Sequence, residues 1–591
     1  MLPALSEFRL LETLKLGGCS RLKPEHFVQL SSSNSSLRSL QVSNCTQISS
    51  LASICQLTSL RELDISGCTG LRPDSLRQLT LLTNLSSLLL GGCTVRDADV
   101  ARLTALRALA LLSAWGTEAG SACFPSLAMC PALTSLDLSW TSAQQLPALP
   151  LLQVLKMAHC GVQGVWWPES IAHQEGGSSR VGDVPPLQEL HLPWAEFGGR
   201  EWEEVELFIS MAAPALHTLD LSHTAAAGLE CLQGAPRLTA LNLAGCLVGD
   251  REALMVACCT RLKTLVLAGA GVGAPGVQHL ASLPLIQKLD LSSTPCDDAC
   301  MAALMTLRTL QTLDISNTPA STLTALPPTH QALPLVSTLT TVAPTHASAN
   351  ANASSSSSHG RASPPAAQSK ALLQERVSAP AAPFPALRRL CALHTGLTAS
   401  AVSGLTVFRD SLVHLSLGFA VAGPGGSVLP GRPRDSSVKV VCELTRLASL
   451  ALEGWDLTGP GLLPLQHLPN LTSLSISHSS MLATRHMLSL LQLSDSLKHV
   501  TLDGVAVAEP REGGDPAITH QQQGQGLRDA SGEVSRQAMP KCAADDGRLK
   551  YSREALEVLR LSPLVLGQEG MPALLRAGDV EGLSLFVGGG D

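Results

Sequence analysis

A nine-residue phrase, with leucine at its first, fourth and sixth positions and Cys, Asn, Thr or Ala at its ninth, recurs along this chain. Residues 60–68 read LRELDISGC, and residues 85–93 read LSSLLLGGC. Steps of 24 residues separate the copies that begin at Leu238, Leu262, Ile286 and Leu310. Periods of about 20–29 residues are typical of stacked repeats, in which no unit can bury its leucines alone. The chain is therefore expected to grow by adding units to one stack.

The copies fall into two blocks. The first block has copies beginning at Leu11, Leu37, Leu60, Leu85, Leu106, Leu133, Leu152, Leu187, Leu216, Leu238, Leu262, Ile286 and Leu310. The second has copies at Leu387, Leu412, Leu447, Leu471 and Leu497, and a weaker terminal copy begins at Leu556. This many copies in one register predict the fold more strongly than any single match could.

Positions 4 and 6 of each unit alternate with outward positions, as a short strand requires. Each strand is expected to pair in parallel with that of the next unit, and the other half of the unit should return as a helix or a 3₁₀ turn. Position 9 should face inward at the turn and take a small side chain, and a buried cysteine fits such a slot. The cysteines expected there are Cys19, Cys45, Cys68, Cys93, Cys160 and Cys246.

Residues 129–140, MCPALTSLDLSW, resemble the repeats of F-box leucine-rich-repeat proteins, with a cysteine three residues before the first leucine. Cys130 and Cys259 both hold that place. The chain thus resembles a leucine-rich-repeat protein of the cysteine-containing or ribonuclease-inhibitor-like type over most of residues 1–326 and 384–506. The resemblance implies an α/β solenoid: a horseshoe with a parallel β-sheet on its concave face and helices or 3₁₀ turns on its convex face.

Composition shifts suggest five segments. These are a first repeat block (1–326), a disordered low-complexity insertion (327–383), a second repeat block (384–506), a disordered insertion (507–551) and a degenerate terminal repeat or cap (552–591). Residues 327–383 are rich in Ser, Ala and Pro, with little to bury. They are either an insertion in one continuous solenoid or a linker between two, and we favour the insertion because insertions in repeats usually map to loops.

The bulk chemistry argues against several functional classes. A net charge of −7 gives no general case for a nucleic-acid or membrane partner. The N-terminus does not resemble a signal peptide, and the uncharged residues 119–136 contain too much Ser, Thr and Pro for a membrane span, so a cytoplasmic protein with reduced thiols is expected. We find no catalytic or phosphate-binding motif and expect no enzyme activity, cofactor or metal.

The candidate for a metal site is the pair Cys296 and Cys300. The two cysteines have helical spacing but lack a second pair of ligands.

Position 8 is the most informative outward position. It is Gly or Asn in the first four units but becomes Trp140, His159, Trp194 and His223 in successive later ones. In a parallel stack these rings should form a column with about 4.8 Å between strands. Exposed Trp is a common interface anchor, and histidine could make contacts depend on pH. The alternative is that the rings only cover the rim and pack on one another.

Other residues extend this prediction. Position 8 continues in the second block with His394, Phe419 and His478. The pair Trp166 and Trp167 could arch over the column or simply plug a turn. Position 5 repeats as aspartate, which is common in this repeat class but could also favour a basic partner; these residues are Asp64, Asp137, Asp220, Asp290 and Asp314.

The leading functional hypothesis is a non-enzymatic, monomeric scaffold that binds another protein on its concave face. The F-box resemblance implies an alternative, a substrate-recognition subunit of an SCF-type ubiquitin ligase, although no F-box is visible before Leu11. A third hypothesis is a cytoskeletal or ciliary axoneme assembly protein. A nuclear location is a further possibility.

Overall fold

The structure is a computed structural model. It describes residues 10–33, 36–168, 185–197, 199–322, 384–419, 433–455, 457–478, 496–503, 558–561 and 584–587. The chain divides into one unit formed by Met1–Thr324 with Pro383–Asp591 and a second formed by Ala325–Ala382; every described residue belongs to the first. The predicted disordered segments 327–383 and 507–551 lie outside the described residues.

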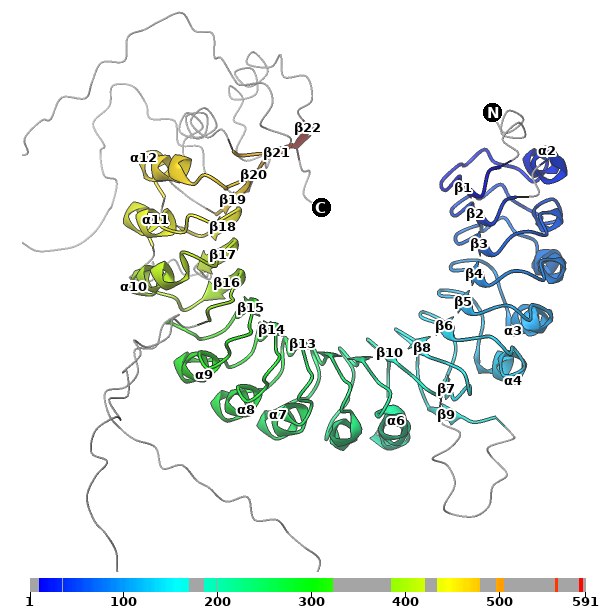
Figure 1. Cartoon of the computed structure of the whole chain (residues 1–591), viewed down its shortest axis with the longest axis horizontal. Helices are drawn as coiled ribbons and strands as arrows, with labels where there is room; N and C mark the ends of the chain where they lie inside the picture. The colour runs from blue at the N-terminus through cyan, green and yellow to red at the C-terminus, as the bar shows by residue number, and fades with distance from the viewer. Residues whose placement is uncertain are drawn as a thin grey trace, which may run out of the picture. The chain divides into compact units, whose positions relative to one another are not determined.

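Among the described residues, twenty short strands form one sheet, which lines the inner face of this unit (Figure 1). Each strand pairs in parallel with the next one along the sheet, as the repeat register predicts, for example β3 with β4 and β12 with β13. The strands are β1 Thr13–Lys15, β2 Ser39–Gln41, β3 Glu62–Asp64, β4 Ser87–Leu89, β5 Leu111–Ser113, β6 Ser135–Asp137, β8 Val154–Lys156, β10 Glu189–His191, β11 Thr218–Asp220, β12 Ala240–Asn242, β13 Thr264–Val266, β14 Lys288–Asp290, β15 Thr312–Asp314, β16 Arg389–Thr395, β17 His414–Phe419, β18 Ser449–Glu453, β19 Ser473–Ser477, β20 His499–Asp503, β21 Val558–Leu561 and β22 Ser584–Val587.

Short helices and 3₁₀ turns cover the other side of the sheet (Figure 1). The α-helices are α2 His26–Ser33, α3 Asp97–Arg102, α4 Phe124–Leu127, α6 Gly199–Ala212, α7 Asp250–Ala257, α8 Ala274–Leu280, α9 Asp298–Leu304, α10 Ala399–Ser403, α11 Asp435–Val441 and α12 Gly459–Leu462. The 3₁₀ helices are η1 Ile54–Gln56, η2 Pro73–Leu81, η3 Leu103–Ala105, η4 Ser121–Cys123, η6 Glu230–Gly234, η7 Gly404–Phe408 and η8 Leu463–His467.

The leucines of successive units share one apolar interior between the sheet and the convex layer. Leu63, Leu88, Leu136 and Leu219 are all buried in the same core cluster. Full burial of one such side chain contributes roughly 1.5–3 kcal/mol. The gain repeats with each unit, so the stack is held together by nearest-neighbour contacts.

One unit starts three residues later than the sequence pattern predicts. Leu112, not Leu109, is the central residue of β5, where it pairs with Leu88 and Leu136, so the phrase begins at Leu109 instead of Leu106. Leucines three residues apart make both registers possible. The turn decides between them, because position 8 then falls on Gly116, whose φ of +63° suits the left-handed turn that follows the strand.

The sheet runs without a break from the first repeat block to the second. Strand β15 pairs in parallel with β16, and Leu313 lies opposite Leu390. Beyond the strands, the N–H of Asn317 donates to the carbonyl of Leu393 at 2.7 Å. This continuity is what an insertion in a single solenoid requires, while the segment boundaries themselves stay predictions.

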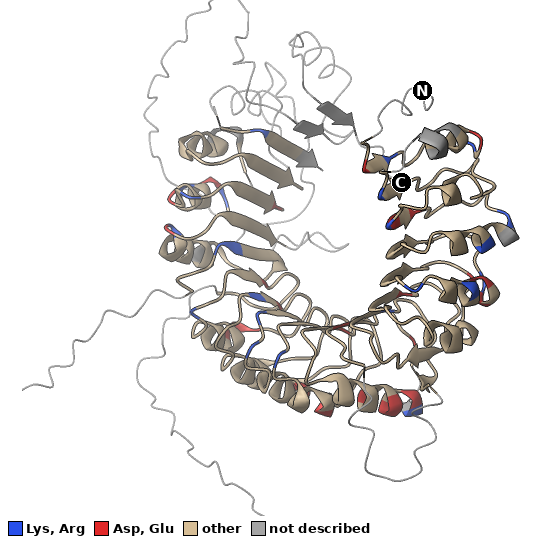
Figure 2. Cartoon of the chain, turned by 45° about the vertical axis from the view of Figure 1, so that its right-hand side comes forward, with Lys and Arg blue, Asp and Glu red and all other residues tan. Residues whose placement is uncertain are grey.

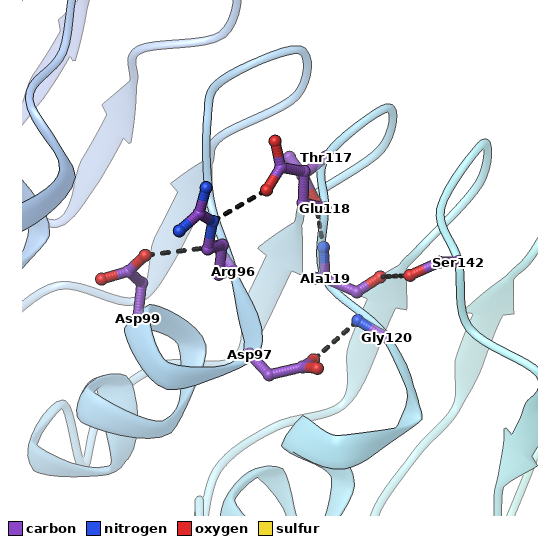
Figure 3. Close-up of polar contacts among 8 residues, drawn as sticks. All are labelled: Arg96, Asp97, Asp99, Thr117, Glu118, Ala119, Gly120 and Ser142. Atoms are coloured by element: carbon purple, nitrogen blue, oxygen red, sulfur yellow. Dashed lines mark hydrogen bonds and ion pairs between the residues drawn. The ribbon is translucent and has the colours of Figure 1, made fainter.

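A carboxylate at the start of several convex helices ties each unit to the next. In α3, Asp97 accepts a 2.6 Å hydrogen bond from the N–H of Gly120 in the following unit (Figure 3). In α7, Asp250 accepts the N–H groups of Gly273 and Gly276. The same contact is made by Asp298 with Ser321 and Thr322, and by Asp435 with Thr458. These carboxylates satisfy backbone donors that would otherwise be unpaired between the convex segments.

Within the described residues, two successive units carry extended chain on the convex side. Strands β7, Gln145–Pro147, and β9, Gly164–Trp166, pair in parallel on that side. Trp166 packs edge-on against Phe124, and Trp167 packs against Phe208 of α6. Both tryptophans therefore pack within the convex layer, and of the two alternatives for Trp166 and Trp167 the structure supports the plug.

No helix in the described part of the chain has the length and apolar character that a bilayer crossing requires. The uncharged residues 119–136 instead contain η4, α4 and the start of β6.

Candidate partner-binding surface

Four aromatic rings stack in a column at the edge of the sheet where strands β6, β8, β10 and β11 end. The ring centroids of Trp140 and His159 are 3.6 Å apart, with 22° between the planes. His159 and Trp194 are 5.6 Å apart at 7°, and Trp194 and His223 are 3.9 Å apart at 11°. The predicted column of Trp140, His159, Trp194 and His223 is thus present, and we call these four residues the ring column.

The indoles of the ring column remain open to solvent. The exposed fraction is 60% for Trp140 and 50% for Trp194, although each ring is stacked on a neighbour. Stacking fixes the orientation of each ring, and the exposed part of each indole leaves apolar area available to a ligand.

Each residue of the ring column has a left-handed backbone. The φ angles of Trp140, His159, Trp194 and His223 are +59°, +54°, +58° and +58°. This conformation costs residues with a Cβ roughly 1–2 kcal/mol each, which explains why most of the other described units place Gly or Asn at the same position. Bulky rings in this position are therefore unusual and need a compensating interaction or a function.

Two exposed rings each lie against a glycine of a neighbouring unit. Gly245 lies against His223, the last ring of the column, and Gly91 lies against Trp115. A Cβ at Gly245 would lie 2.4 Å from Nδ1 of His223, and a Cβ at Gly91 would lie 2.0 Å from Nε1 of Trp115. Trp115 is 44% exposed and sits at position 7 of the unit before Trp140. Sequence reasoning missed Trp115 because the wrong register for that unit hid its outward position.

The position-5 aspartates cap the turns that end their strands. In each case a carboxylate oxygen accepts the backbone N–H two residues further on, at 2.9–3.0 Å; the pairs are Asp64–Ser66, Asp137–Ser139, Asp220–Ser222, Asp290–Ser292 and Asp314–Ser316. Asp137 also accepts the hydroxyl of Ser113, and Asp220 accepts that of Ser222. These bonds give the aspartates a structural role, while partner binding by Asp137 and Asp220 stays a prediction.

Five of the six cysteines predicted at position 9 are buried, and Cys19 is not. The thiols of Cys68, Cys160 and Cys246 donate to the position-6 carbonyl of the preceding unit at 2.9–3.2 Å. Burial raises the pKa of Cys68 to about 12 and that of Cys93 to about 11. The prediction is wrong for Cys19, which is exposed because no described unit precedes it to supply that carbonyl and cover the thiol.

A scan against models of protein families and a search of curated proteins each return no match. Several solved structures are similar in fold. An internalin of Listeria monocytogenes is 15% identical, with 80% of this chain and 88% of that chain covered and a TM-score of 0.35. The ectodomain of the Arabidopsis thaliana receptor kinase GASSHO1/SCHENGEN3, in complex with CASPARIAN STRIP INTEGRITY FACTOR 2, is 18% identical. The match covers 86% of this chain and 60% of that chain, with a TM-score of 0.39.

The structure of TLR13 with ssRNA13 is 15% identical, covers 85% of this chain and 62% of that chain, and has a TM-score of 0.45. At these identities the likeness concerns the fold and does not identify a ligand. The repeated phrase, the parallel register and the convex helices agree with it. The chain folds as a leucine-rich-repeat solenoid.

The second block of this leucine-rich-repeat solenoid departs from the ring column. Phe419 is buried and packs edge-on against Trp455 at 6.0 Å, so the expected exposed ring is absent. The reason is that β17 extends through Phe419, whose backbone does not enter the left-handed turn. His394 and His478 do have that turn, and each lies 3.5 Å from the same carboxylate oxygen of Glu453.

The described residues hold no group of three His, Cys, Asp or Glu side chains able to bind a metal ion. Around Cys296 and Cys300, the two intervening aspartates already have partners: Asp297 accepts the N–H of Ala299 and of Cys300 at the start of α9, and Asp298 binds the next unit. This segment therefore serves helix capping and packing.

Proposed function

We propose that this leucine-rich-repeat protein is a non-enzymatic scaffold that binds a partner protein through the ring column. The observation that carries the proposal is the stack of Trp140, His159, Trp194 and His223, with both indoles half or more exposed. Rigid aromatic side chains at fixed spacing are typical anchors of protein interfaces.

The energetics of the ring column favour a binding role over simple packing. Three stacked contacts stabilise the fold by about 0.5–1.5 kcal/mol each. Four residues in the left-handed conformation cost roughly 1–2 kcal/mol each. Stacking therefore offsets only part of the backbone strain. Glycine would adopt the left-handed conformation at each position without that strain. Strain that persists at an exposed cluster is the pattern of a functional surface.

Affinity capture followed by mass spectrometry tests the proposal. The full chain is compared with W140A/W194A and with L207A/L254A, which removes two exposed apolar side chains from the convex helices α6 and α7. We expect specifically captured proteins to be lost with W140A/W194A and retained with L207A/L254A. Equal capture by all three proteins would remove the ring column from the proposal.

Nothing in the described residues favours the ubiquitin-ligase or axonemal hypotheses, so both stay predictions of the sequence. The same holds for the cytoplasmic location, the monomeric state and the absence of a nucleic-acid partner.

A further inference from the structure

A second exposed surface lies where strands β13 to β16 begin, on a later part of the sheet than the ring column. Lys263 directly precedes β13, Lys288 begins β14, Arg388 directly precedes β16 and Arg389 begins it. All four side chains are exposed, and we call them the basic strip. Lys and Arg recur along this part of the sheet (Figure 2).

Strand register brings the basic strip together. Lys288 lies opposite Thr312, which lies opposite Arg389. The carbonyl of Lys263 accepts the N–H of Lys288, so these two residues occupy neighbouring units. With about 4.8 Å between adjacent strands, Lys288 and Arg389 are separated by about 9.6 Å of sheet.

The cations of the basic strip form no ion pair within the described part of the chain. The outward positions between them carry Gln287, Gln311, Thr264 and Thr312. The chain as a whole carries a net charge of −7, so the strip is a local reversal of sign.

The electrostatic surroundings of titratable groups differ between the beginnings and the ends of these strands. The pKa of His414, which lies opposite Arg389 on β17, is lowered by burial and by the positive charge of Arg389. Where β14 and β15 end, burial and the nearby carboxylate of Asp290 raise the pKa of Asp314, although hydrogen bonds from Ser316 oppose this. The sheet surface is therefore basic where strands β14 to β16 begin and acidic where β14 and β15 end.

We propose that the basic strip binds an extended acidic segment, rich in Asp and Glu, of a partner protein. Alternate side chains of an extended peptide are about 6.6 Å apart, so its carboxylates can reach cations on neighbouring strands. Asp290 and Asp314 repel such a segment from the strand ends and so set its position on the sheet.

A peptide fits this surface better than RNA does. Single-stranded nucleic acid is usually held by aromatic side chains that stack on bases. Among the described residues, the outward positions of β13 to β16 carry no Trp, Tyr or Phe. The carboxylates of Asp290 and Asp314 would also oppose the dense charge of a phosphate backbone.

The test measures fluorescence anisotropy of a labelled oligo-glutamate peptide titrated with the full chain. K288E/R389E reverses two charges of the basic strip, and K288Q/R389Q neutralises them. The control, R200E/K439E, makes the same change in net charge at exposed positions of the convex helices α6 and α11. Circular dichroism melting curves check that each variant is folded.

We expect salt-sensitive binding that weakens by about tenfold or more in K288E/R389E, less in K288Q/R389Q, and little in R200E/K439E. W140A/W194A should bind the peptide as the wild type does, which separates this proposal from that for the ring column. Absence of peptide binding, or equal binding by K288E/R389E and its control, would overturn the proposal. So would tight binding of a polyuridine RNA through the same residues without peptide binding.

Discussion

The imidazole of His223 covers Gly245 in the next unit so closely that a Cβ at residue 245 would lie 2.4 Å from Nδ1 of the ring. Gly245 also has a φ of +67°. The last ring of the column thus depends on the absence of a side chain next to it, and this dependence can be measured.

Substitution G245A should destabilise the protein by more than the roughly 1–2 kcal/mol cost of the left-handed backbone alone, because His223 must also move. The matched control is G116A, at a glycine with φ +63° where the nearest atom to the added Cβ, the backbone nitrogen of Gly92, is 3.8 Å away. Urea unfolding of G245A, G116A and H223A/G245A checks this. H223A should recover part of the loss in the double variant, and equal losses in G245A and G116A would contradict the predicted clash.

Ser293 has a φ of +57° but no ring to stack on another, so its strain is not offset by aromatic packing. We expect S293G to stabilise the fold by about 1 kcal/mol, since glycine adopts this conformation without steric cost. The comparison is S292G, one residue earlier and outside the left-handed region, which should stabilise nothing. A rise in the urea midpoint for both variants, or for neither, would refute the explanation from backbone strain.

The buried position-9 thiols should resist alkylation. Burial raises the pKa of Cys68 to about 12, so almost none of it is thiolate at pH 8, and the side chain is also shielded. Cys19 and Cys258 are exposed. Iodoacetamide labelling of the folded chain, read by peptide mass spectrometry, should modify Cys19 and Cys258 well before Cys68 and Cys93. Labelling of all four at one rate would show that the stack opens readily.

The carboxylate of Asp298 should stabilise the junction between two units in a pH-dependent manner. Although burial would raise its pKa, hydrogen bonds from Ser321 and Thr322 hold the pKa below the ordinary value. A lowered pKa in the folded state gives stability that is present above the unfolded-state pKa and lost as pH falls through the folded-state value.

We therefore expect D298A to cost about 1–2 kcal/mol near neutral pH, with the difference from wild type shrinking below about pH 4. Urea midpoints measured across the acid range check this. A difference that stayed constant with pH would mean that the carboxylate charge is not what binds Ser321 and Thr322.

Much of the fold could be predicted because its pattern is local and repeated. The spacing of Leu63, Leu88, Leu136 and Leu219 was enough to predict a shared interior, and the strand register followed from it. The alignment of Trp140 with Trp194 could also be predicted, since equal positions in stacked units must lie above one another.

Other features could not be read from the pattern. The unit containing Leu109 had two possible registers, and only the turn at Gly116 distinguished them. Phe419 stands at the same position as Trp194, yet a longer strand turns it into the core. Cys19 has the same place in the phrase as Cys68 but lacks a described unit in front of it.

The amino-acid sequence by itself determined that leucine-bearing units stack in parallel and which side chains share each column, because the apolar period leaves one efficient way to bury the leucines. Only the tertiary structure decided which columns remain available for binding. It showed that the position-5 carboxylates accept backbone N–H groups, that the ring column stacks in a strained conformation, and that Arg389 lies two strands along the sheet from Lys288. Residues that are far apart in the sequence become hydrogen-bond partners or strand neighbours only when the units pack, and the spacing of leucines within a unit does not specify those contacts.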